Sequence, residues 1–220
     1  MSVVRLVVLG VMRMRGQAHG YAVHRELLSW RVETWTSVKP GSIYHALKQL
    51  TKEGKLRAAG TEESTEGPGR TLYELTEAGG AEFRQLLDAA LTSIQLEELG
   101  AGVAFMQTLP RQHVIDRLKE QHRRATEISR GLENMMPMFP QRDAPPHTQD
   151  LLALWSAAVG ATARWTAQLI RRLEAGEYVM AGEDREGTKA GEAGETGEVG
   201  EIRAAGVTGG AEAAGPAAPE

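Results

Sequence analysis

Hydrophobic residues recur at helical spacing through the first part of the chain. From residue 3 to 14 they stand three or four positions apart, as on one face of an α-helix, and Gly16 ends the run. The same spacing predicts a second helix over residues 20–30 and a third over 42–53. The inner face of the third helix is then formed by Ile43, Leu47 and Leu50.

The hydrophobic pattern changes after the third predicted helix. The sequences KLRAAG at 55–60 and RTLYEL at 70–75 are strand candidates, and the polar segment with glycine and proline between them is typical of a loop. Thr76 is a suitable N-cap for the helix that follows. Three helices followed by a β-hairpin predict a winged helix-turn-helix domain.

The remainder of the chain has helical spacing. It predicts helices from Thr76 to residue 94, over 96–106, from Pro110 to 135 with the proline in the first turn, and over 150–174. A connector at 136–146 holds four of the nine prolines. Two long helices with wide apolar faces need a partner, so we expect a helical dimerisation domain and a homodimer. The last helix presents on one side Leu151, Leu154, Trp155, Ala158, Thr162, Trp165 and Leu169.

Composition separates the end of the chain from the rest. Residues 181–220 hold ten glycines, ten alanines and no aromatic residue, so they cannot bury enough apolar surface to offset the entropy lost on ordering. This tail is predicted to be disordered. The fold class is therefore mainly α. The predicted domains are a winged helix-turn-helix at 1–85, a helical dimerisation and effector domain at 86–178, and a tail at 179–220.

The net charge of −4 is the sum of three segments, +7 over residues 1–60, −5 over residues 61–180 and −6 over residues 181–220. The first 60 residues carry ten basic side chains against three acidic ones, whereas residues 181–220 carry three basic against nine acidic. A local excess of positive charge favours contact with nucleic acid. The charge pattern therefore indicates that a nucleic-acid partner binds the predicted winged helix.

Composition also excludes several classes of protein. Without cysteine there is no disulfide scaffold, cysteine-ligated zinc or iron–sulfur cluster, and no apolar run is long enough to span a membrane. We expect a cytoplasmic, nucleoid-associated protein. The six histidines lack metal-ligand spacing, and the sequence has no phosphate-binding glycine loop and no credible serine–histidine–acid set. These features predict no metal, no cofactor and no enzymatic activity.

The predicted third helix has a polar face suited to DNA. An α-helix fits the major groove, where the base edges present distinguishable donors and acceptors. The face opposite the inner one carries no carboxylate. His45, Lys48 and Gln49 are candidates for reading bases, whereas Ser42 and Tyr44, near the start of the helix, are better placed for phosphates.

Three motifs follow one another in the first part of the chain: HGYAVHREL at 19–27, GSIYHALKQLTKEGKL at 41–56 and GPGRTLYELTEAG at 67–79. With them the sequence resembles the PadR family of bacterial transcriptional regulators over roughly residues 3–85. The rest, including FMQTLPRQHVIDRL, is similar to the C-terminal domain of the virulence-activator-like branch of that family. The resemblance implies a ligand-responsive repressor that binds a palindromic operator in double-stranded DNA as a homodimer.

The resemblance also implies roles for individual residues. It associates Tyr21, Ser42 and Tyr44 with DNA contact. Together with the polar face of the third helix, this gives a predicted set of DNA contacts: Tyr21, Lys39, Ser42, Tyr44, His45, Lys48, Gln49, Lys52 and Arg70.

Two positions depart from the family pattern. His45 stands where the family often has proline, which adds a group that could read a base. The wing, usually basic, carries Glu62, Glu63 and Glu66, with Arg70 as its basic residue. Phosphate repels carboxylates, so minor-groove reading should depend on Arg70 or be weak.

Two further questions stay open in the sequence. Some members of the family bind flat aromatic effectors at or near the dimer interface, and Trp155 and Trp165 could hold such a ligand, although aromatic residues at helical spacing more often pack in a core or an interface. The acidic wing and tail also leave an alternative function, a helical protein-interaction adapter whose winged helix does not read DNA.

Overall fold

The computed structural model describes residues 2–62, 69–139, 145 and 147–183. The predicted tail beyond residue 183 and the acidic segment 63–68 lie outside the described residues. Within these ranges, no helix combines the length and the hydropathy needed to cross a bilayer.

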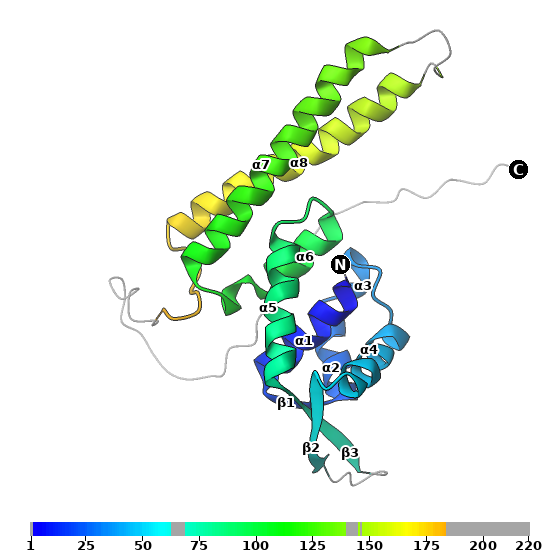
Figure 1. Ribbon diagram of the computed structural model, residues 1–220, viewed down its shortest axis with the longest axis vertical. Coiled ribbons are helices and arrows are strands. Elements are labelled where there is room, and N and C mark those ends of the chain that lie inside the picture. The colour runs from blue at the N-terminus through cyan, green and yellow to red at the C-terminus, as the bar shows by residue number, and fades with distance from the viewer. Residues whose placement is uncertain (1, 63–68, 140–144, 146, 184–220) are drawn as a thin grey trace, which may run out of the picture. The chain divides into compact units, whose positions relative to one another are not determined.

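The helices predicted from apolar spacing at the start of the chain are present. They are α1 (Val3–Arg15), α2 (Gly20–Ser29) and α4 (Pro40–Lys52), which Figure 1 shows packed together. The inner face predicted for the third helix is confirmed, because its three apolar residues are all buried. This helix begins two residues before the predicted start, since proline with its fixed φ suits the first helical position.

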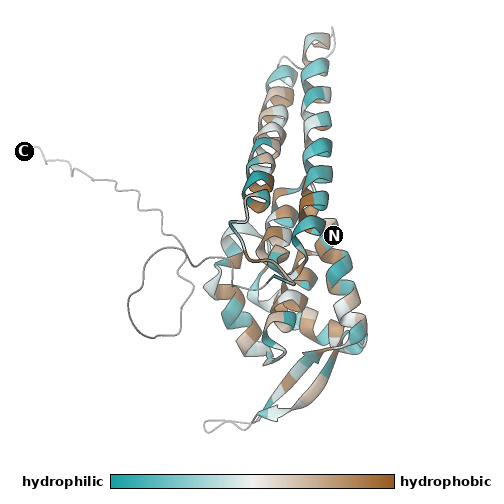
Figure 2. Cartoon of the chain, turned by 90° about the vertical axis from the view of Figure 1, so that its left-hand side faces the viewer, coloured by the Kyte–Doolittle hydropathy of each residue, from teal (hydrophilic) through white to brown (hydrophobic). Residues whose placement is uncertain are grey.

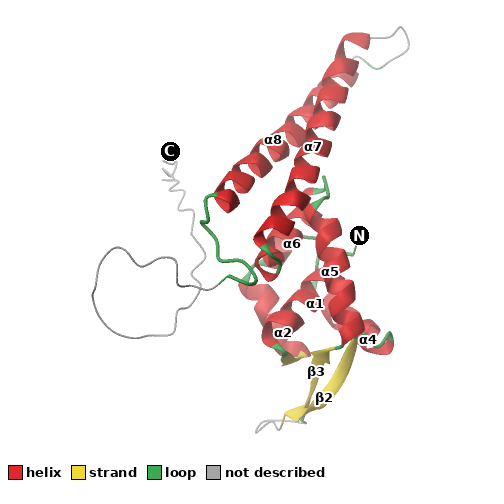
Figure 3. Ribbon diagram, turned by 60° about the vertical axis from the view of Figure 1, so that its left-hand side comes forward, coloured by secondary structure: helices red, strands yellow, loops and turns green. Residues whose placement is uncertain are grey.

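Two short elements were not predicted. The strand β1 (Gln17–His19) pairs with β3 (Arg70–Leu75), which also pairs with β2 (Leu56–Glu62), so the sheet has three antiparallel strands in the order β1-β3-β2 (Figure 3). The helix α3 (Val32–Trp35) lies between α2 and α4. Elements of three or four residues are too short to show a hydrophobic period.

The core continues from the three-helix unit into α5 (Glu77–Leu91) and α6 (Leu96–Phe105). The predicted N-cap is confirmed, because the Thr76 hydroxyl accepts a hydrogen bond from the backbone N–H of Gly79 at 3.1 Å. Gly10 on α1 lets Phe105 pack closely, since a Cβ there would lie only 2.3 Å from the ring. The predicted domain boundary at residues 85 and 86 falls within α5 and stays a prediction.

The helices α7 (Arg111–Met135) and α8 (Thr148–Glu174) form an antiparallel hairpin (Figures 1 and 3), with the short 3-10 helix η2 (Met136–Met138) after α7. Figure 2 shows hydrophilic and hydrophobic residues alternating along both long helices. Pro110, predicted in the first turn, is instead the N-cap of α7, one position before the first helical residue. The side of α8 that is buried carries leucine and isoleucine together with three small or polar residues: Leu152, Ser156, Ala163, Thr166, Leu169, Ile170 and Leu173.

The apolar side predicted for the last helix is for the most part exposed, and it is not the side of α8 that is buried. Leu154 and Trp155 are 62 % and 54 % exposed, and Leu151 and Trp165 are also exposed. Leu169 is the exception, because it is buried. A large part of the apolar surface of α8 is therefore left without a partner in the single chain.

The segment after α8 folds back onto the start of α7. Arg111 binds Glu183 through two contacts of 2.8 and 2.6 Å, and this guanidinium lowers the pKa of the Glu183 carboxyl. The backbone N–H of Ala181 donates to the carbonyl of Leu109 at 3.2 Å, and Met180 is buried. Residues 179–183, assigned by the sequence to the tail, thus belong to the folded part of the chain.

Candidate nucleic-acid interface

The outward face of α4 carries three exposed side chains, His45, Lys48 and Lys52. They lie on the side of the helix opposite the buried apolar residues. Within the part of the chain that the structure describes, none of the three side chains forms a hydrogen bond, an ion pair or a ring contact. Two cations and an imidazole are therefore free to bind a ligand.

A hollow of about 770 Å³ adjoins this face and is lined by residues from α2, α4 and β3. Tyr21 and Tyr44 are both about half exposed, and the ring of Tyr44 packs against that of His24 with centroids 5.7 Å apart. Five of the nine predicted DNA contacts meet here: Tyr21, Tyr44, Lys48, Lys52 and Arg70.

Ser42 and Gln49 lie on a different side of α4. The Ser42 hydroxyl donates to the carbonyl of Lys39 at 2.7 Å and accepts from its N–H at 3.1 Å, so it caps the helix. Gln49 Nε2 donates to Glu53 Oε1 at 2.9 Å. The structure does not bring these two predicted residues to the hollow.

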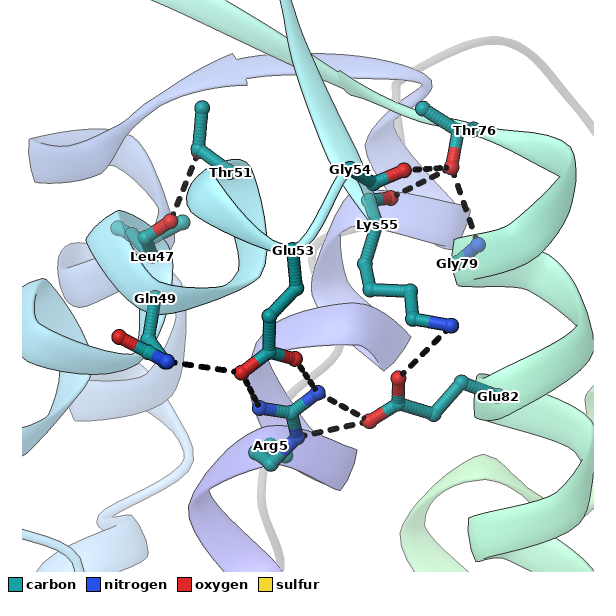
Figure 4. A network of polar contacts seen from close by, with 10 residues as sticks. All are labelled: Arg5, Leu47, Gln49, Thr51, Glu53, Gly54, Lys55, Thr76, Gly79 and Glu82. Atoms are coloured by element: carbon teal, nitrogen blue, oxygen red, sulfur yellow. Dashed lines mark hydrogen bonds and ion pairs between the residues drawn. The ribbon is translucent and has the colours of Figure 1, made fainter.

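An ion-pair network fixes the C-terminal end of α4 (Figure 4). Arg5 of α1 lies 2.6 Å from Glu53 Oε2, at the C-cap of α4, and 2.7 Å from Glu82 Oε1 of α5. Lys55 Nζ lies 3.6 Å from the second oxygen of Glu82. Hydrogen bonds from Arg5, then from Gln49, lower the pKa of Glu53. One arginine thus connects α4 to two neighbouring helices.

The N-terminal end of α4 is held as well. Glu97 of α6 accepts hydrogen bonds from the backbone N–H and the hydroxyl of Ser37, both at 2.8 Å, just before the helix begins. With contacts at both ends, α4 presents its exposed face on a fixed support. Neither Arg5 nor Glu97 was predicted to serve the site, because each acts on residues far away in the sequence.

The described base of the wing contacts the helix-turn-helix. The guanidinium carbon of Arg70 lies 5.6 Å from the centroid of the Tyr21 ring. Glu62 Oε2 lies 3.3 Å from Nε2 of His19, whose Nδ1 accepts the N–H of Ala22 at 3.0 Å. Glu63 and Glu66, which the sequence places at the acidic tip, lie outside the described residues.

The predicted effector residues are not together in one chain. Trp155 and Trp165 are ten positions apart on α8, which separates their backbones by about 15 Å along the helix axis. Both side chains are substantially exposed. One chain alone cannot hold a small flat ligand between them. Among the described residues, no group of three or more His, Asp or Glu side chains is arranged to hold a metal ion.

Several solved structures are similar to the chain. Bacillus subtilis PadR in complex with operator DNA is 21 % identical, with 78 % of this chain and 99 % of that chain covered and a TM-score of 0.35. The same protein in complex with p-coumaric acid is 20 % identical, with 79 % and 99 % covered and a TM-score of 0.32. A PadR-like transcriptional regulator from Bacillus cereus is 21 % identical, with 79 % and 99 % covered and a TM-score of 0.32.

A family match locates the domain within the sequence. No curated protein matches the chain. Residues 8–85 match the transcriptional regulator PadR-like family. This range contains the three sequence motifs, the exposed face of α4 and the base of the wing. The chain therefore carries a domain of the PadR-like family of transcriptional regulators at residues 8–85.

Proposed function

We propose that this protein is a sequence-specific DNA-binding regulator, a ligand-responsive repressor that binds a palindromic operator as a homodimer. The PadR-like domain supports the regulatory role. The observation that carries the proposal is the exposed, carboxylate-free face of α4, where His45, Lys48 and Lys52 have no side-chain partner among the described residues. A rigid helix with such a face fits the major groove and offers donors to base edges and phosphates.

The roles of the residues follow from their positions. His45 and Lys48 project from the outward face and would read base edges. Lys39, Lys52, Tyr21, Tyr44 and Arg70 surround that face and would bind phosphates. Ser42 and Gln49 complete the predicted set. Both are hydrogen-bonded within the free protein, so contact with DNA requires each to exchange its present partner.

The homodimer is supported by the unpartnered side of α8. Leu151, Leu154, Trp155 and Trp165 are exposed along one side of α8, an apolar strip that a second copy would cover. Two-fold symmetry would place two α4 helices about one helical turn of DNA, ~34 Å, apart on a palindromic site.

A small aromatic effector is supported by the exposed tryptophans on the same strip. Bacillus subtilis PadR was solved with p-coumaric acid. Since Trp155 and Trp165 are far apart within one chain, a flat ligand would lie between tryptophans of two copies. Its binding would change the spacing of the two α4 helices and so release DNA.

The proposal is tested by gel-shift titration with the DNA upstream of the encoding gene, at stated salt concentrations, against a scrambled fragment of equal length. We expect a discrete complex with the upstream fragment at concentrations where the scrambled DNA stays free. Equal binding to both, or none, would contradict the proposal and favour the protein-interaction adapter.

A further inference from the structure

A second hollow, of about 430 Å³, adjoins the first and is lined mainly by residues of α2. The two hollows share His19, Tyr21 and Arg70. The second one adds Arg25, four positions after Tyr21 on α2 and therefore on the same side of the helix. Sequence motifs gave Arg25 no role, but the structure places it beside the proposed DNA surface.

The charges in this hollow are not balanced. Arg15 is paired with Glu26, so these two side chains neutralise each other. Arg25 is exposed, and within the described ranges its side chain has no hydrogen bond or ion pair. Arg70 also has no ion pair there, and its contact is with the face of the Tyr21 ring. Two guanidinium groups that have no ion pair with any described residue thus line the same hollow as Tyr21.

The position of Arg70 is set by the base of the wing. Glu62 stands opposite Arg70 in the β2–β3 register and could neutralise it. Its carboxylate instead lies 3.3 Å from Nε2 of His19. Arg70 is left with the ring of Tyr21, an arrangement favoured because aromatic faces attract cations. The guanidinium is therefore held at the side of the helix-turn-helix.

We propose that Tyr21, Arg25 and Arg70 form a phosphate clamp beside α4, and that Arg70 binds the DNA backbone and does not read the minor groove. The inference rests on the proposed DNA-binding function. Guanidinium and phenol groups are suited to phosphate oxygens, and contacts of this kind fix the orientation of a protein on the duplex without reading its sequence.

The test compares R25A and R70A with R130A, which removes an exposed arginine of α7 outside the PadR-like domain. Affinity is measured over a salt series for the operator fragment and for scrambled DNA. R25A and R70A are expected to weaken binding to both DNAs by the same factor and to reduce the salt slope by about one each. R130A should keep the wild-type slope. Thermal melts followed by circular dichroism confirm that each variant is folded.

The outcomes separate the clamp from the proposed function. If R70A weakens binding only to fragments with A·T pairs at a particular flank, Arg70 reads the minor groove and the clamp is wrong. If the wild type binds its operator and both variants keep its affinity and slope, the clamp alone fails. Binding of no DNA by the wild type would reject the function as well.

Discussion

Arg5 on α1 lies 2.6 Å from Glu53, which is the C-cap of α4. The same guanidinium contacts Glu82 of α5. The pair therefore fixes the direction in which α4 projects, although neither residue lines the 770 Å³ hollow beside α4. Because a small rotation of α4 would displace His45 and Lys48 together, this support matters for recognition as well as for stability.

Replacing the arginine should make stability less dependent on pH. Arg5 lowers the pKa of Glu53, so the pair stabilises the folded protein above the usual glutamate pKa and loses that contribution as pH falls through the lowered value. R5M should therefore lower the urea midpoint at pH 7, and the difference from wild type should shrink toward pH 3. A constant difference across this range would show that the ion pair is not the cause.

Two lysines of α4 should have different effects on DNA recognition. K48A should cost about 1–3 kcal/mol against the preferred base at one operator position and relax specificity there. K52A should weaken binding to all sequences alike and reduce the salt slope by about one. Competition assays with single-base operator variants distinguish the two patterns. If both K48A and K52A lose the same affinity for every operator variant, Lys48 contacts the DNA backbone and not a base.

Removing the carboxylate opposite Arg70 in the strand register should strengthen DNA binding. Glu62 is exposed at the edge of the proposed DNA surface, so E62Q should raise affinity a few-fold at low salt, with the gain lost at high salt because surface charges are screened. E33Q, on the exposed side of α3, is the matched control. Weaker binding by E62Q would show instead that the contact with His19 holds the wing in place for DNA.

The buried amide of Gln121 should lower the stability of the hairpin formed by α7 and α8. Gln121 of α7 is fully buried, and neither polar atom of its side chain has a hydrogen-bond partner among the described residues. Q121L should raise the free energy of unfolding by about 1–3 kcal/mol, since an unsatisfied polar group is removed. The exposed Gln112 provides the control Q112L, expected to change stability by less than about 0.5 kcal/mol. Destabilisation by Q121L would indicate that the amide is hydrogen-bonded in solution.

The exposed side of α8 should be required for dimerisation. L154E places a charge on the apolar strip, whereas A153E places one on another exposed side of the same helix. We expect L154E to be a monomer and A153E a dimer in sedimentation experiments, with equal helix content. Operator affinity should fall in L154E alone, because a dimer binds two half-sites at once. If L154E were still a dimer, the dimer interface would lie elsewhere on the protein.

Regular features of the fold could be predicted from local pattern, and their mutual contacts could not. The inner face of α4 and the cap at Thr76 follow from residue spacing, and both are confirmed. In the sequence, Arg5 is 48 positions from Glu53 and 77 positions from Glu82. No short sequence period could therefore reveal the hydrogen bonds between them. The sequence also could not show which side of α8 packs on α7, because the buried side includes serine, threonine and alanine.

In the candidate site, too, local patterns could be predicted from the sequence and contacts between distant residues could not. The exposed polar face of α4 is visible in the sequence because helical spacing separates it from the apolar face. The placement of Arg25 and Arg70 in one hollow beside α2 depends on the pairing of β1 with β3, and β1 has only three residues. Ser42 and Gln49 are on the predicted helix, but their hydrogen bonds turn them toward structural partners.

Genome-wide mapping of DNA sites bound by the wild type and by a double variant, H45A with K48A, tests the central claim most directly. The account predicts discrete sites for the wild type that share a two-fold symmetric sequence with half-sites about one helical turn apart. The double variant should lose these sites while retaining its fold and its dimer. Absence of discrete sites for the wild type, or sites unchanged in the double variant, would contradict recognition through the exposed face of α4.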